Sequence, residues 1–126
     1  MLEIKPVEDK EMQKKYCEIA GVTYVADALA YMAFVNTMET GLCQFGIKGN
    51  VGYVYSLTQM PEKDDTEALF IMARAALSFM ALCGAEIADM TDCETTDRLK
   101  NVVGFKKDEN GKYLLSIKGM NEHHCK

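Results

Sequence analysis

The sequence has no excess of basic residues. Its 14 lysines and arginines stand against 19 aspartates and glutamates, which gives a formal net charge of -5. A negatively charged protein repels phosphate backbones and anionic lipid head groups. We therefore expect no nucleic-acid partner and no membrane partner.

The sequence also has no regularly spaced cysteine pairs, and it has no histidine outside the tail. The cysteines are odd in number and none belongs to a Cys-x-x-Cys pair, although a secreted disulfide scaffold normally uses an even, patterned set; they are Cys17, Cys43, Cys83, Cys93 and Cys125. Free thiols in a reducing cytoplasm fit this pattern. The two histidines, His123 and His124, are adjacent in the tail and poorly placed for one tetrahedral ion. We therefore expect no metal, and Cys43 has no histidine nearby that would make it a nucleophile.

Long uninterrupted apolar runs are absent. The first ten residues alternate charged and apolar side chains, unlike the apolar centre of a signal peptide. The longest apolar stretch, residues 68–83, is interrupted by Arg74 and Ser78 and is shorter than the roughly 20 residues of a membrane span. No linker, repeat or low-complexity tract divides the chain. A single cytoplasmic domain over residues 1–126 is expected.

The apolar residues that are present begin with a strand pattern and continue with a helix pattern. Residues 2–6 alternate apolar and charged side chains up to Pro6, which predicts a strand. Residues 9–20 carry apolar side chains at helical spacing, with Asp9 placed to cap the first turn and Gly21 placed to end the last. One strand followed by one amphipathic helix is predicted.

Residues 28–60 have the period of strands. Apolar residues recur at every second position in three runs, separated by expected turns at residues 37–41 and at Gly49-Asn50. Glycines are dense here, and a glycine inside a strand either bends the sheet or admits another chain segment closely. The pattern predicts a three-stranded antiparallel meander.

The second half of the chain is organised around a long apolar helix. Residues 66–83 are apolar nearly all round, which predicts a central, covered helix that ends at Gly84. A short strand, a short helix and a hairpin are expected at residues 85–90, 95–103 and 105–118. The expected fold class is α/β (α+β), with a mixed, mostly antiparallel twisted sheet of about six to seven strands and helices on both faces.

Two short phrases and the order of the elements resemble a known superfamily. Leu-Lys-Asn-Val-Val-Gly-Phe-Lys at residues 99–106 is similar to the phrase "leucine, tyrosine, x, x, leucine, glycine, phenylalanine" of the GCN5-related N-acetyltransferases (GNAT). Residues 53–62, which end in Leu-Thr-Gln-Met-Pro-Glu, resemble the run that precedes the cofactor loop of that superfamily. The sequence therefore resembles a small GNAT protein over about its whole length.

The resemblance implies an acetyl-CoA site where the fourth and fifth strands part, and acetyl transfer to a small amine. Backbone groups of Leu57, Thr58 and Gln59, together with Thr66 at the phosphate loop, would hold the cofactor. Lys100 stands where many GNAT enzymes carry the tyrosine that protonates the leaving thiolate. The fourth strand offers Tyr55, with Tyr53, where a glutamate often deprotonates the amine. Packing of the two tyrosines against a helix is the alternative reading.

The phosphate loop departs from the superfamily pattern. Asp64-Asp65-Thr66-Glu67-Ala68-Leu69 matches none of its three key positions. Asp64 and Glu67 have the spacing of a capping box, so the protein's own carboxylates would occupy N–H groups that otherwise receive phosphate. This degenerate loop keeps a second hypothesis open, a catalytically silent module that binds another ligand or self-associates. A metal or thiol-redox protein is a third.

Two further features have alternative readings. Arg74, alone on the apolar helix, would either clamp an anionic ligand or pair with an acidic residue of the same chain. The nine methionines would either fill the core or form the interface of a homodimer.

Overall fold

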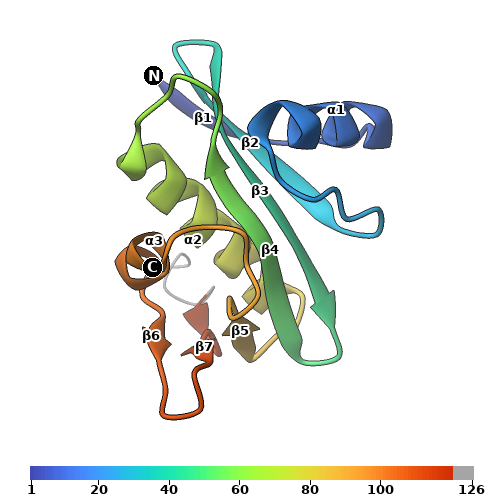
Figure 1. The fold of residues 1–126 in the computed structure, drawn as a ribbon. Helices are drawn as coiled ribbons and strands as arrows, with labels where there is room; N and C mark the ends of the chain where they lie inside the picture. Colours follow the sequence, from blue (N-terminus) through green and yellow to red (C-terminus); the bar gives the residue numbers. More distant parts are fainter. Residues whose placement is uncertain (121–126) are drawn as a thin grey trace.

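The computed structural model describes residues 1–120 of the chain. Within these residues it has seven strands and three helices (Figure 1). Their bounds are β1 (Leu2–Pro6), α1 (Lys10–Ala20), β2 (Leu29–Val35), β3 (Met38–Lys48), β4 (Val51–Gln59), α2 (Thr66–Leu82), β5 (Ile87–Asp89), α3 (Asp97–Val103), β6 (Lys106–Lys107) and β7 (Tyr113–Ser116).

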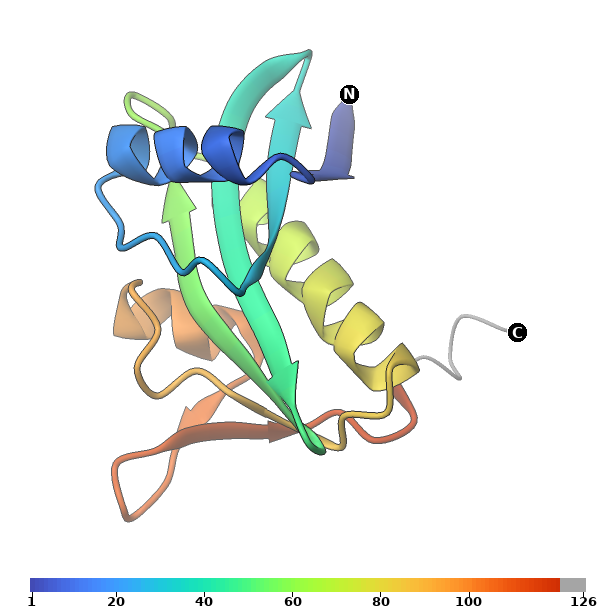
Figure 2. The same cartoon turned by 90° about the vertical axis from the view of Figure 1, so that its right-hand side faces the viewer.

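The strands form one sheet in the order β1-β2-β3-β4-β5-β7-β6. Only β4 and β5 pair in parallel, and every other neighbouring pair is antiparallel. Helix α1 covers one face of the sheet, whereas α2 and α3 cover the other (Figures 1 and 2). Each face has its own buried apolar cluster. The predicted mixed, mostly antiparallel sheet with helices on both faces is confirmed.

Helix α2 is the central helix that the apolar run predicted. The carboxylate of Asp65 accepts the Ala68 N–H at 2.9 Å and caps its first turn. The cap is therefore one residue later than the predicted pair of Asp64 and Glu67. The helix ends at Cys83, and Gly84 follows with a φ of 100°. Its buried residues lie against the sheet, and they are Ala68, Leu69, Met72, Ala73, Ala76, Leu77 and Met80.

Glycines in the meander admit this helix. A Cβ on Gly41 would lie 2.5 Å from Cδ2 of Leu69, and one on Gly52 would clash with Sδ of Met80. The expected turn at residues 37–41 is wrong, because β3 begins at Met38 and Gly41 lies within it. Asn36 and Thr37 make the turn instead, with φ values of 51° and 69°. Gly41 serves the close approach of α2, a long-range contact that local pattern does not reveal.

The remaining expectations concern single side chains and the tail. Nη1 of Arg74 donates to the Val103 carbonyl at 2.9 Å, so its partner is the C-terminal end of α3 and not a carboxylate. His123, His124 and Cys125 lie outside the described residues. Within residues 1–120, no helix combines the length and the apolarity that crossing a bilayer requires.

Candidate functional site

The parallel strands β4 and β5 stay together for only three residue pairs. Val51, Gly52 and Tyr53 pair with Ile87, Ala88 and Asp89. Just beyond, the register of β4 on β3 shifts, because Val54 pairs with Phe45, Ser56 pairs with Gln44, and Tyr55 has no partner on β3. Such a β-bulge bends its strand and re-aims the backbone. Strand β4 continues to Gln59 after β5 has ended, paired with β3 on one side only.

The segment between β5 and α3 returns to β4 at one residue, Glu94. Its N–H donates to the Tyr55 carbonyl at 2.9 Å, and its C=O accepts the Leu57 N–H at 3.2 Å. Its carboxylate accepts the Thr23 N–H at 2.9 Å, from the 21–28 loop that follows α1. Figure 1 shows the segment passing beside β4. Glu94 thus bridges the parting strands and ties them to the loop on the α1 face.

Beyond Glu94 one edge of β4 is open. Backbone groups alternate between the two sides of an antiparallel strand, so the Leu57 C=O and the Gln59 N–H face the same side as the Leu57 N–H. Thr58 and Met60 face β3, where Thr58 pairs with Leu42 and the Met60 N–H donates to the Thr40 carbonyl. No described residue hydrogen-bonds to the Leu57 C=O or the Gln59 N–H. These groups can pair with an extended ligand that carries amides.

The loop from β4 to α2 is closed by its own hydrogen bonds. Oε1 of Gln59 accepts the Asp65 N–H at 3.1 Å, and Met60 accepts the Lys63 N–H at 3.1 Å. Glu62 holds a φ of 66° in the left-handed region, where glycine is the favoured residue. The Asp65 cap leaves the N–H groups of Thr66 and Glu67 without a described partner.

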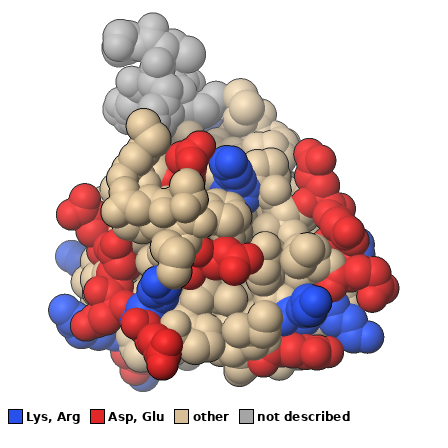
Figure 3. Space-filling view, turned by 90° about the horizontal axis from the view of Figure 1, so that it is seen from above, with Lys and Arg blue, Asp and Glu red and all other residues tan. Residues whose placement is uncertain are grey.

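The charge around this loop is negative. Residues 62–67 include four carboxylates and one lysine, Lys63, and Glu62, Asp64 and Glu67 are exposed. Seen from this end, the molecule carries acidic side chains along both sides of the face (Figure 3). The field therefore disfavours a second anion at the start of α2, where a helix dipole alone would attract one.

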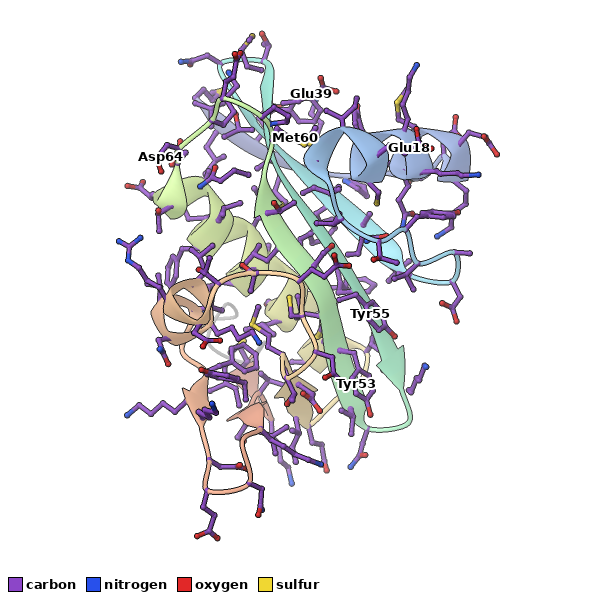
Figure 4. The ribbon with its side chains drawn as sticks, in the orientation of Figure 1. Glu18, Glu39, Tyr53, Tyr55, Met60 and Asp64 are labelled. Carbon is purple, nitrogen blue, oxygen red and sulfur yellow. The ribbon has the colours of Figure 1, made fainter. Side chains whose placement is uncertain are left out.

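The two residues predicted to act in catalysis lie on opposite faces of the sheet. Tyr55 projects on the α1 face, where its ring packs on Gly46 and lies parallel to Tyr53 with 6.4 Å between centroids (Figure 4). Lys100 is buried on the α2 face, where Nζ donates to the Thr91 carbonyl at 3.1 Å and lies 4.7 Å from the ring centroid of Tyr113. The structure does not bring these two side chains together.

The predicted cofactor residues lie on β4 and at the start of α2; the backbone groups of Leu57 and Gln59 face the open edge, whereas those of Thr58 face β3. The side chain of Leu57 is fully buried against α2, and the Thr58 hydroxyl donates to the Gln59 carbonyl at 3.3 Å. Gln59 contributes its side chain to the loop and its N–H to the edge. Thr66, half-buried, is the first residue of α2.

Gln44 is a residue that sequence reasoning missed. Its fully buried amide accepts from Nε2 of Gln13 at 2.9 Å and from the Val25 N–H at 3.0 Å. It donates to the Thr23 carbonyl at 2.7 Å and to Oγ of Ser56 at 3.1 Å. Gln44 therefore fastens α1 and the 21–28 loop to the sheet beside the bulge. A glutamine at an inward position of an apolar strand was the only available signal.

Comparisons with known proteins rest on structure alone. No family model and no curated protein matches the sequence. The ribosomal-protein-S18-alanine N-acetyltransferase of Escherichia coli superposes with a TM-score of 0.68 at 10% identity, covering 94% of this chain and 95% of that one. A GNAT family acetyltransferase of Brucella melitensis in complex with acetyl-CoA gives 0.66 at 16% identity, over 92% of this chain and 88% of that one.

A third solved structure extends the likeness. The PaiA N-acetyltransferase of Thermoplasma acidophilum in complex with coenzyme A gives a TM-score of 0.64 at 15% identity, over 90% of this chain and 96% of that one. Each match covers nearly all of both chains. The protein therefore has the fold of the GCN5-related N-acetyltransferase superfamily.

Proposed function

We propose that this chain binds an acyl thioester of coenzyme A beside β4 and transfers its acyl group, acetyl in the simplest case, to a small amine. One observation carries the proposal: the sheet's one parallel pair parts at the Tyr55 bulge and leaves the Leu57 C=O and the Gln59 N–H open. Solved structures of the same fold hold coenzyme A or acetyl-CoA. A reducing cytoplasm, where the thioester and the free cysteines both persist, is the proposed setting.

The residues fit one half of the cofactor. A pantetheine arm is extended and carries two amides, so it can pair with a strand edge as a peptide does. The open backbone groups of β4 supply one acceptor and one donor for this purpose.

The residues do not fit the other half. A diphosphate at a helix start needs free N–H groups and no competing anion, whereas α2 begins with the Asp65 cap and three further carboxylates. We therefore assign no step to the nucleotide. Acetyl-CoA is expected to bind no more tightly than S-acetylpantetheine.

When bound, the thioester supplies a carbonyl carbon that an amine attacks, so that a C–N bond forms and the C–S bond breaks. Holding the two reactants together provides much of the acceleration in such a transfer. Tyr55 is our candidate for accepting a hydrogen bond from the attacking amine on the α1 face, whose proton then passes to water, and Lys100 is our candidate for supplying a proton to the thiolate. Lys100 has to leave its bond to Thr91 to do so.

A catalytically silent binding module is the second candidate. Two observations favour it: Glu94 already occupies the Leu57 N–H, which leaves the arm only the Leu57 C=O and the Gln59 N–H, and Lys100 is buried against Thr91 and Tyr113. Such a protein would bind the thioester or another extended ligand without turning it over.

Calorimetric titration with acetyl-CoA and with S-acetylpantetheine tests binding. We expect both to bind, and to shift the Gln59 amide resonance but not that of Lys48 at the far end of β3. The proposal is refuted if neither compound, at millimolar concentration, gives heat of binding or stabilises the protein against thermal unfolding.

Transfer is measured as thiol release with a panel of small amines. Cys83 is exposed and Cys125 lies outside the described residues, so both are replaced by serine before a thiol reagent is used. Burial raises the pKa of Cys93 to about 12, so this thiol reacts only slowly with the reagent. Binding without release above a heat-inactivated control would favour the silent module.

A further inference from the structure

A second concavity lies away from β4, on the α2 face near the start of β2. It encloses about 530 Å³ between the sheet, the second half of α2 and the segment that joins β1 to α1. Small-molecule sites commonly have volumes of roughly 300 to 1,000 Å³. Its walls are mainly apolar, formed by Ile4, Leu29, Tyr31, Phe45, Ala75 and Phe79.

Three aromatic rings make up the floor. Tyr31 and Phe45 lie 4.9 Å apart between centroids, and Phe79 meets Phe45 edge to face at 6.1 Å. Leu29, at the margin, remains 46% exposed. Apolar surface that stays in contact with water forgoes roughly 25 cal/mol per Å². An apolar ligand that covered these walls would recover part of that free energy.

The mouth of the cavity has one fixed cation. Lys10 lines it, and its ammonium donates to the Ala28 carbonyl and to Oε1 of Gln13, the latter at 3.2 Å. An ammonium has three N–H donors, so one is left for a ligand. Glu8 also lines the mouth, but it is exposed and no described residue holds its carboxylate. The cation is held in place, whereas the anion is free to turn toward water.

We propose that this cavity binds a small apolar carboxylate, with its hydrocarbon on the aromatic floor and its carboxylate on Lys10. The site lies on the α2 face at the β1–β2 end of the sheet, and none of its lining residues belongs to the open edge of β4. The inference therefore does not depend on the proposed acyl transfer. It adds a separate ligand site to the domain.

Octanoate is the test ligand, and octanamide is its uncharged match. In wild-type protein, octanoate should cause saturable methyl shifts at Ile4 and Leu29, and octanamide should bind roughly ten-fold more weakly. Lys10→Gln should remove that difference. Lys14→Gln, an exposed charge on α1 outside the cavity, should preserve it.

A second variant fills the space. Ala75→Phe places a ring in the cavity and should weaken octanoate binding at least ten-fold, whereas Leu82→Phe, at the exposed end of α2, should leave it unchanged. Three results would overturn the proposal: no saturable shift at millimolar octanoate, shifts located elsewhere, or sedimentation showing a dimer that already covers Ile4 and Leu29. If Ala75→Phe does not fold, the octanoate-induced shifts in the wild type and the binding measurements on Lys10→Gln still test the proposal.

Discussion

Removing two carboxylates at the start of α2 should strengthen the binding of acetyl-CoA. The change is Asp64→Asn with Glu67→Gln, because both side chains are exposed and neither is the helix cap. Asp65 is left in place, since loss of a cap costs about 0.5 to 2 kcal/mol of stability. The variant therefore alters charge while the fold is kept.

The magnitude follows from the exposure of these groups. Two unit charges 4 Å apart interact by about 1 kcal/mol in bulk water and by about 4 kcal/mol near a protein surface. Exposed side chains move and are screened by salt, so each carboxylate is expected to contribute about 0.5 kcal/mol. Two of them correspond to a roughly five-fold gain in affinity. The N–H groups of Thr66 and Glu67, which have no described partner, then meet the diphosphate with less opposition.

The assay is calorimetric titration at low and at high salt. Acetyl-CoA should bind more tightly to the variant at low salt, the gain should shrink at high salt, and S-acetylpantetheine should be unaffected. Glu86→Gln is the control, because it removes one carboxylate, beside Lys118 and at the opposite end of α2, and should leave acetyl-CoA binding unchanged. An unchanged or weakened acetyl-CoA affinity in the double variant would show that these carboxylates do not oppose the diphosphate.

Three further predictions concern stability and titration. Gln44→Leu should cost about 3 kcal/mol in urea unfolding, because Val25 N–H and Thr23 C=O lose their buried partner, whereas Ile47→Val on the same strand should cost less than about 1.5 kcal/mol. Gly52→Ala should lower the free energy of unfolding by about 1 to 3 kcal/mol, because the added Cβ clashes with Met80. In a Met80→Ala background the same Gly52→Ala change should cost less than in the wild type, and equal costs in the two backgrounds would count against the clash. A hydrogen bond to Glu39, with burial, raises the pKa of Tyr16 from 10.0 to about 12, so the folded state keeps this proton longer and its contribution to stability is lost as the pH rises from 10 to 12. The difference between the absorbance titrations of the wild type and of Tyr16→Phe should show the high pKa of Tyr16. Glu39→Gln should lower this pKa, and an unchanged pKa in Glu39→Gln would disprove the hydrogen bond.

Local pattern was enough to predict most of the elements. Alternation identified β1 and the meander, helical spacing identified α1 and α2, and Asp9 and Gly21 cap α1 as expected. These features depend on neighbours within a few residues, which a sequence displays directly. The turn of Asn36 and Thr37 was misplaced, because the glycine at position 41 is required by the close packing of Leu69 from a helix distant in sequence and not by a turn.

The site was less predictable, for a physical reason. The backbone groups of Leu57 and Gln59 face the open edge of β4 and those of Thr58 face β3, but what the edge offers depends on Glu94, which pairs with it from another segment. Lys100 had the position of a proton donor in the sequence, yet its ammonium is turned inward to Thr91 and Tyr113. Hydrogen bonds between segments distant in sequence decide which groups are free to bind or to react, and the spacing of residues does not predict these bonds.

The bridge at Glu94 imposes an order of events on any ligand that takes the Leu57 N–H. Its entry displaces the contact between Glu94 and β4, and the same residue holds Thr23 through its carboxylate. Withdrawal of Glu94 therefore loosens the 21–28 loop on the opposite face at the same moment. Occupation of the Leu57 N–H on one side of the sheet and release of the 21–28 loop on the other become a single linked equilibrium.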